Sequence, residues 1–179
     1  SEATPSISDT DPERSSMGQG THQFASVQLA RYVTALANRG TVYDLSLIDK
    51  ETDSQGNLVK DYSPAVASTL DFQTSTWDAV HQGMRQVVTN SSTKRVFDGL
   101  DVHVAGKTGT TTDNFDRYFV GYTPYYVAAV WTGYEVNVKM NASGNPSAQL
   151  FRKVMSKVHA NLPNKNFFTV DSGLTTVSV

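Results

Sequence analysis

Residues 105–111 read AGKTGTT and say more about this chain than any other segment. They end a run of alternating residues, 102–111, that predicts a β-strand. Two more strands are predicted at 117–123 and 126–134, joined by a tight turn at Pro124, because proline cannot extend a central strand. Strands joined this closely pair antiparallel, so the sequence predicts an antiparallel sheet.

Three helices are predicted around the strands from apolar residues at helical spacing. The first covers 26–38, with Ser26 as its N-cap. The second covers about 76–89, with Ser75 as a candidate cap. The third covers about 147–161 and should lie across the sheet. Its predicted apolar side consists of Leu150, Phe151, Val154, Met155 and Val158.

The remaining segments complete the predicted organisation. A polar turn separates two short strands, 43–49 and 58–62, which predict a hairpin at the domain edge. Residues 1–16 have few apolar side chains to bury, so they are predicted to form a flexible leader. Residues 17–162 are predicted to be one domain of the α/β class (α+β type), with an antiparallel sheet flanked by helices. Residues 163–179 are a C-terminal tail without a predicted element.

The composition argues against several classes of protein. Fifteen Lys and Arg stand against 17 Asp and Glu, a formal net charge of -2, so no global positive field favours a nucleic-acid partner. The chain has no cysteine and only four scattered histidines, so we expect neither a metal nor a cofactor. No run approaches the roughly 20 apolar residues of a membrane-spanning helix. Any membrane anchor is therefore expected in a segment outside this chain.

The triplet Gly106-Lys107-Thr108 invites comparison with a phosphate-binding loop. Such a loop needs a glycine five positions before its Gly-Lys-Thr core, and that position is Asp101. An acidic side chain there argues against nucleotide binding, because a phosphate cradle needs an open backbone.

Read one residue later, the triplet at 107–109 is Lys-Thr-Gly, a signature of penicillin-binding proteins and class A β-lactamases. After it, DRYFVGYTP at 116–124 and VWTGY at 130–134 resemble the strands of bifunctional, class A penicillin-binding proteins. Before it, SMGQG at 16–20 and the segment 28–40 resemble monofunctional, class B members, so the subclass stays open. The chain is similar to the C-terminal part of a penicillin-binding protein transpeptidase domain, which implies an incomplete β-lactamase/transpeptidase-like fold.

The resemblance implies a role for each residue of the strand. A transpeptidase holds the carboxylate of a D-Ala-D-Ala stem peptide while a serine attacks the preceding carbonyl, so it needs a cation, hydroxyls and an oxyanion-binding amide. Lys107 would supply positive potential beside the nucleophile, and the hydroxyls of Thr108 and Thr110 would face the carboxylate. The Thr110 N–H would be half of the oxyanion hole, and Gly109 would let the acyl donor lie against the strand. Thr111 completes the predicted substrate-binding set; the alternative is an ordinary strand that ends in a polar turn.

Two literal matches to the other family signatures are not accepted as catalytic. SSTK at 91–94 fits Ser-x-x-Lys but begins only 16 residues before Lys107, after a helix rather than at its start. SGN at 143–145 fits Ser-x-Asn but follows Lys107, which inverts the family's order. We therefore expect that the nucleophile-bearing N-terminal half is missing and that this chain is inactive alone. Self-association, or pairing with the missing half, would cover its apolar surface.

The functional prediction follows from the family. The full-length protein is expected to be a serine-type peptidoglycan D,D-transpeptidase on the extracytoplasmic face of the bacterial membrane. Its expected partners are peptidoglycan stem peptides and β-lactam antibiotics. A β-lactam sensor or a carboxypeptidase on the same fold is a close alternative, and residues 119–124 favour a transpeptidase. A non-catalytic interaction domain is the alternative from another class.

Overall fold

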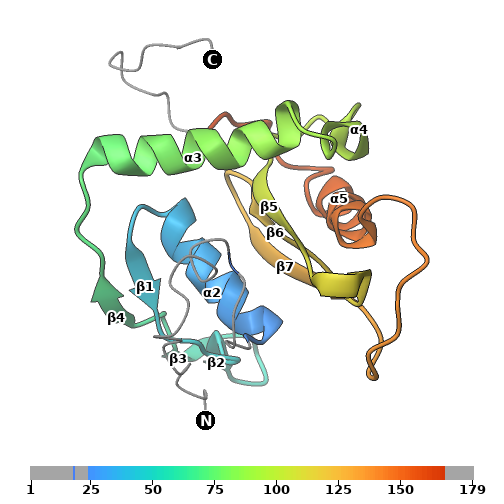
Figure 1. The fold of residues 1–179 in the computed structure, drawn as a ribbon. Helices are drawn as coiled ribbons and strands as arrows, with labels where there is room; N and C mark the ends of the chain where they lie inside the picture. The colour runs from blue at the N-terminus through green and yellow to red at the C-terminus, as the bar shows by residue number, and fades with distance from the viewer. Residues whose placement is uncertain (1–17, 19–23, 168–179) are drawn as a thin grey trace, which may run out of the picture.

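A three-stranded antiparallel sheet in the order β5-β6-β7 forms the centre of the molecule (Figure 1). The computed structural model describes Gly18 and residues 24–167. β5 spans Ala105–Thr110, β6 spans Arg117–Tyr122 and β7 spans Val127–Thr132. The register of β5 and β6 runs without a break from Ala105 opposite Tyr122 to Thr110 opposite Arg117. The predicted antiparallel sheet is confirmed.

The first of these strands begins later than predicted. Residues 102–104 lie outside β5. The carbonyl of Val104 accepts a hydrogen bond from Nη1 of Arg85 (2.5 Å), a partner outside the sheet. The turn before β7 closes as expected, with the N–H of Thr123 donating to the carbonyl of Tyr126 (2.8 Å).

Helices cover both faces of the sheet (Figure 1). α2 (Ser26–Ala37) packs on one face, and α5 (Pro146–Val158) packs on the other. α3 (Thr74–Thr89) contacts β5, and the short α4 (Lys94–Phe97) follows it. All three predicted helices are present.

Each face has its own apolar core, because successive side chains of a strand point to opposite sides. The buried residues on the α5 side are Val88, Phe97, Val104, Phe119, Ala148, Phe151 and Met155. The buried residues on the α2 side are Val33, Ala105 and Tyr122. Phe167 packs against this second cluster, with its ring 5.5 Å from that of Tyr122. The leader and the rest of the tail lie outside the described residues, so the predicted domain boundaries stay predictions.

Both predicted N-caps are wrong. Ser26 is the first helical residue of α2, and the cap position is Ala25. The N–H of Ala25 donates to Oε1 of Gln28 (2.9 Å), because this longer side chain reaches back across the first turn. Ser75 is the second residue of α3, which has no side-chain cap.

The apolar side predicted for α5 is only partly buried. Phe151 and Met155 are 0% and 2% exposed, whereas Leu150, Val154 and Val158 are 47%, 44% and 46% exposed. The three exposed residues recur at every fourth position, so they form a stripe along one side of the helix. No described segment buries this stripe.

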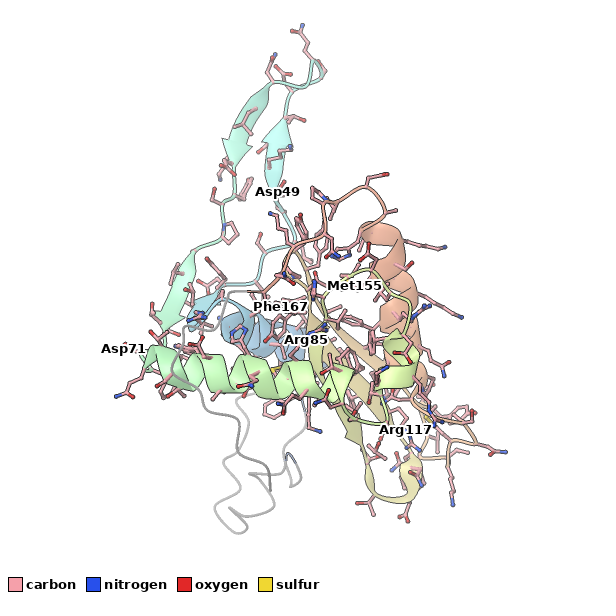
Figure 2. The ribbon with its side chains drawn as sticks, turned by 90° about the horizontal axis from the view of Figure 1, so that it is seen from above. Asp49, Asp71, Arg85, Arg117, Met155 and Phe167 are labelled. Atoms are coloured by element: carbon pink, nitrogen blue, oxygen red, sulfur yellow. The ribbon has the colours of Figure 1, made fainter. Side chains whose placement is uncertain are left out.

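Two small sheets lie apart from the central one. β1 (Thr41–Tyr43) pairs with β4 (Val66–Thr69), and β2 (Lys50–Thr52) pairs with β3 (Leu58–Asp61). The β2-β3 hairpin projects from the body of the molecule (Figure 2). A hairpin is therefore present around the predicted turn, with its second strand as predicted and its first strand at Lys50–Thr52.

The strand predicted at 43–49 is wrong. Tyr43 ends β1, and β2 begins only at Lys50. Between them Oγ of Ser46 donates to the carbonyl of Ile48 (2.8 Å) and accepts its N–H (3.1 Å). This local side-chain turn competes with the strand that the apolar residues predict.

Candidate active site

The hydrogen bonds after β5 show which way its backbone groups point. The N–H of Thr111 donates to the carbonyl of Asp116 (3.3 Å), in register with the β5-β6 ladder. Bonded and non-bonded pairs alternate in an antiparallel ladder, so the backbone groups of Lys107 face β6 and those of Thr108 and Thr110 point away from it. No described strand pairs with that other edge of β5. The Thr110 amide is therefore directed away from β6, toward the edge of β5 with which no described strand pairs.

The Lys107 ammonium lies at the same edge. The Lys107 side chain is exposed, and its Nζ donates to the carbonyl of Thr108 (2.9 Å). That carbonyl belongs to the set that points away from β6. A cation and an amide donor thus lie on one edge of β5, where an anionic group could contact both.

The side chains of β5 divide between the two faces of the sheet. Lys107 shares the α2 side with Tyr118, whereas Thr108 and Thr110 share the α5 side with Phe119. Thr110 is exposed and Thr108 is half-buried. The substrate role of both hydroxyls stays a prediction.

Gly109 leaves room for an aromatic ring. A Cβ at this position would lie 3.0 Å from Cβ of Tyr118. Burial and the negative charge of Asp116 raise the pKa of Tyr118, which keeps the phenol neutral at pH 7. Gly109 has no side chain, and the Tyr118 side chain occupies the space that a Cβ at this position would need.

The hydroxyl of Thr111 is engaged by Asp116. Oγ1 of Thr111 donates to Oδ2 of Asp116 (3.0 Å) and accepts its N–H (2.9 Å). Asp116 was not singled out as a site residue in the sequence. Its signals in the sequence are its position directly before the predicted strand at 117–123 and its place at the start of the stretch 116–124 that carries the family resemblance.

Arg85 of α3 holds the segment that leads into β5. Its Nη1 donates to the carbonyl of Val104, and its Nη2 lies 3.3 Å from Nδ1 of His103. Sequence reasoning missed this residue, because an arginine beside the apolar stripe of a helix is usually a solvated side chain.

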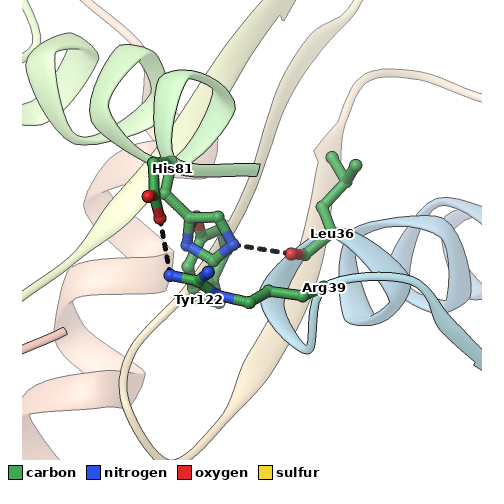
Figure 3. A network of polar contacts seen from close by, with 5 residues as sticks. Leu36, Arg39, His81 and Tyr122 are labelled. Atoms are coloured by element: carbon green, nitrogen blue, oxygen red, sulfur yellow. Dashed lines mark hydrogen bonds and ion pairs between the residues drawn. The ribbon is translucent and has the colours of Figure 1, made fainter. Parts of the chain in front are cut away.

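A part-buried polar network also ties α2 and α3 to the sheet (Figure 3). A carbonyl can only accept, so Nε2 of His81 donates to the carbonyl of Leu36 (2.8 Å), and Nδ1 accepts from the Tyr122 hydroxyl (3.0 Å). An ion pair between Arg39 and Asp78 (2.6 Å) lies beside it. Burial lowers the pKa of His81 and raises that of Tyr122, so both are neutral at pH 7. Tyr122 stands opposite the first residue of β5, so the network supports the candidate site.

The SSTK segment has a structural role. Ser91 follows the end of α3, and its Oγ donates to the carbonyl of Val87 (2.5 Å) and accepts the N–H of Thr93 (3.1 Å). Nζ of Lys94 pairs with Asp98 (2.6 Å). The serine thus satisfies the end of one helix, in agreement with the rejection of this match from its context.

The SGN segment has a structural role as well. Asn145 is the N-cap of α5, where its Oδ1 accepts the N–H of Ala148 (3.0 Å). Its Nδ2 donates to the carbonyl of Tyr118 (3.0 Å). Both ends of the amide are therefore used to dock α5 on β6.

Within Gly18 and residues 24–167, no three His, Cys, Asp or Glu side chains are grouped to hold a metal ion. No helix in this part of the chain has the length and apolarity needed to cross a membrane.

Comparison with known proteins assigns the chain to a family. The model of the penicillin binding protein transpeptidase domain matches residues 4–156. The chain belongs to the penicillin-binding protein transpeptidase family. Penicillin-binding protein 1A of Clostridium perfringens (strain ATCC 13124) is 34% identical over 152 residues, which cover 84% of this chain and 18% of that protein. Penicillin-binding protein 1A of Aquifex aeolicus is 33% identical over 155 residues, which cover 85% of this chain and 21% of that protein.

A solved structure shows the same fold. The crystal structure of penicillin-binding protein 1A from Haemophilus influenzae superposes with a TM-score of 0.69 at 13% identity, covering 86% of this chain and 29% of that one. The predicted family and fold class are confirmed, with class A or class B left open. The chain spans about a fifth of the length of these curated relatives.

Proposed function

We propose that the full-length protein is a peptidoglycan D,D-transpeptidase and that this chain forms the substrate-binding wall of its cleft. The observation that carries the proposal is the position of the Lys107 ammonium and the Thr110 amide on the same edge of β5, the one that faces away from β6. A serine Oγ would attack the carbonyl of the penultimate D-Ala, forming an ester while the bond to the terminal D-Ala breaks and its amine gains the proton. The amine of a second stem peptide would then attack the ester, form the cross-link and release the serine.

The acyl donor would bind as an added strand along the edge of β5 that faces away from β6. The backbone groups of Thr108 and Thr110 that point away from β6 are the partners such a strand needs. The missing side chain of Gly109 permits the close approach. Lys107 would attract the terminal carboxylate, and the Thr110 N–H would stabilise the oxyanion as it develops. A β-lactam would acylate the serine in the same place.

The nucleophile is proposed to lie outside these 179 residues. Ser91 and Lys94 are committed to Val87 and Asp98, and no helix begins at Ser91. We therefore expect neither cross-linking nor stable penicillin acylation from this chain alone.

The rest of the transpeptidase domain is the proposed partner of two uncovered surfaces. One is the outer edge of β7, with which no described strand pairs. The other is the exposed stripe of Leu150, Val154 and Val158 on α5, which packs against β7. An open strand edge beside an apolar stripe favours association. If a second copy of the chain covers these surfaces instead, sedimentation of this chain will show a dimer that the missing half does not dissociate.

A fluorescent penicillin tests the proposal on the full-length protein in membranes, where it should act on the extracytoplasmic face. We expect labelling of the wild type and a loss of about 100-fold or more in the acylation rate of Lys107→Ala. The melting temperature of this variant should not change, because the side chain is exposed. Lys153→Ala is the control, because Lys153 is also an exposed lysine but lies on α5. This variant should be labelled normally.

Each result decides between the alternatives. A folded wild type without labelling contradicts the enzyme and favours a non-catalytic interaction domain. A labelled protein that forms no cross-links is a sensor or a carboxypeptidase. Near-normal acylation of Lys107→Ala contradicts the role of Lys107.

A further inference from the structure

The loop after β5 is fastened at its base by one carboxylate. Oδ2 of Asp116 accepts from the Thr111 hydroxyl (3.0 Å), and Oδ1 accepts from Nε1 of Trp131 (2.8 Å). Trp131 lies in β7, so Asp116 connects the residue that follows β5 with the far strand of the sheet. We call Thr111, Asp116 and Trp131 the loop clasp.

The loop between the two strands has a demanding backbone. Asp113 and Asn114 have φ values of 60° and 62°, a left-handed conformation that is uncommon outside glycine and that Asp and Asn adopt more readily than other residues. The carbonyl of Asn114 accepts the N–H of Met140 (3.0 Å). Such a conformation persists only where surrounding contacts hold it. The loop clasp supplies side-chain contacts of this kind at the base of the loop.

The neighbouring backbone leaves space for the clasp. A Cβ at Gly133 would lie 2.7 Å from Oδ1 of Asp116 and 2.6 Å from Cζ2 of Trp131. Trp131 is 41% exposed, so its hydrogen bond to Asp116 rather than deep burial orients the indole.

We propose that Asp116, anchored by Trp131, is a positioning residue that aims the Thr110 amide at the oxyanion through its hydrogen bond with Thr111. This inference rests on the proposed function. Thr110 is the last residue of β5 and Thr111 is its clasped neighbour, so the clasp determines whether the end of the strand frays. An oxyanion donor is effective only in a fixed position, because a displacement of about 1 Å can cost 100-fold in rate. Lys107 lies further along the ladder and should keep its place.

The test uses Trp131→Phe and Thr111→Val in the full-length protein. The first keeps the ring and loses the N–H donor, and the second keeps the shape and loses the hydroxyl. Tyr125→Phe is the matched control, because it also removes an aromatic donor, the one bonded to the carbonyl of Pro163 (2.8 Å) after α5. Acylation by penicillin is followed against its concentration, well below the melting temperature of every variant.

We expect each clasp variant to lower the maximal acylation rate about tenfold or more, with an unchanged half-saturation concentration and normal behaviour of Tyr125→Phe. The double variant should be no slower than the slower single variant, because both residues act through Asp116. If Trp131→Phe does not fold, Asp116→Asn is used in its place. The amide oxygen of the new asparagine can still accept from Trp131, whereas the carboxylate oxygen that accepts from Thr111 is lost.

Two results overturn the inference alone. In the first, the wild type is labelled and the clasp variants keep the normal maximal acylation rate but have lower melting temperatures. This result would show that the clasp has a purely structural role. The second is a changed half-saturation concentration at a normal maximal rate. An unlabelled wild type overturns the proposed function and this inference with it.

Discussion

The hydroxyl of Tyr122 donates to Nδ1 of His81 over 3.0 Å, and this contact joins the central sheet to α3. The two rings meet edge to face with centroids 5.4 Å apart. Through its other nitrogen, His81 continues to the carbonyl of Leu36 in α2. One imidazole therefore connects three elements behind the start of β5.

Replacing Tyr122 by phenylalanine should destabilise the chain by about 1 to 2 kcal/mol, because a buried imidazole nitrogen loses its donor. Urea unfolding at pH 7.5 measures this loss. Tyr126→Phe is the control, since Tyr126 is 46% exposed. Equal effects of the two changes would contradict a specific role for the buried hydroxyl.

Stability should fall as the pH is lowered from 7 to 5. Burial lowers the pKa of His81 in the folded protein below its ordinary value of 6.5. Near pH 6.5 the unfolded chain therefore binds a proton at His81, whereas the folded protein does not. The stability that is present above this pH is lost as the pH falls toward the pKa of His81 in the folded protein.

Melting temperatures at stepped pH measure this effect, with His81→Gln as the comparison. The slope between pH 7 and pH 5 should be smaller in the variant, because the other histidines contribute equally to both proteins. Identical slopes would show that His81 is not the group that titrates.

Gly109→Ala should lower penicillin acylation of the full-length protein about tenfold or more, because the added Cβ would meet Cβ of Tyr118 at 3.0 Å and displace the strand. Gly83→Ala in α3 is the matched glycine, since a Cβ there meets nothing within 4 Å. It should stabilise the protein by about 1 kcal/mol and leave acylation unchanged. Normal acylation of Gly109→Ala would argue against binding of the substrate along this edge.

Ser91→Ala should leave penicillin acylation of the full-length protein intact. It removes hydrogen bonds at the end of α3 and should reduce stability by about 1 kcal/mol, as measured by urea unfolding. Loss of labelling in a folded Ser91→Ala protein would identify Ser91 as the nucleophile and reverse our assignment.

Elements with a strong periodic pattern were predictable. The alternation in β5, β6 and β7 and the helical spacing in α2, α3 and α5 depend on neighbours in the sequence. The strand predicted at 43–49 failed, because Ser46 makes a local turn that the apolar pattern does not reveal. The exposed side of α5 was missed, because periodicity identifies apolar residues but not what covers them.

By itself the sequence determined the family, the antiparallel sheet and the strand that carries Lys107, because local patterns and short motifs encode these features. Only the tertiary structure decided that the Thr110 amide points away from β6, that Asp116 holds Thr111 and Trp131, and that His81 pairs with Tyr122. The reason is physical: the direction of a backbone amide follows from the ladder register, and the contacts of Trp131 with Asp116 and of His81 with Leu36 join residues 15 and 45 positions apart. Such pairings arise when the elements pack, and no local pattern specifies them.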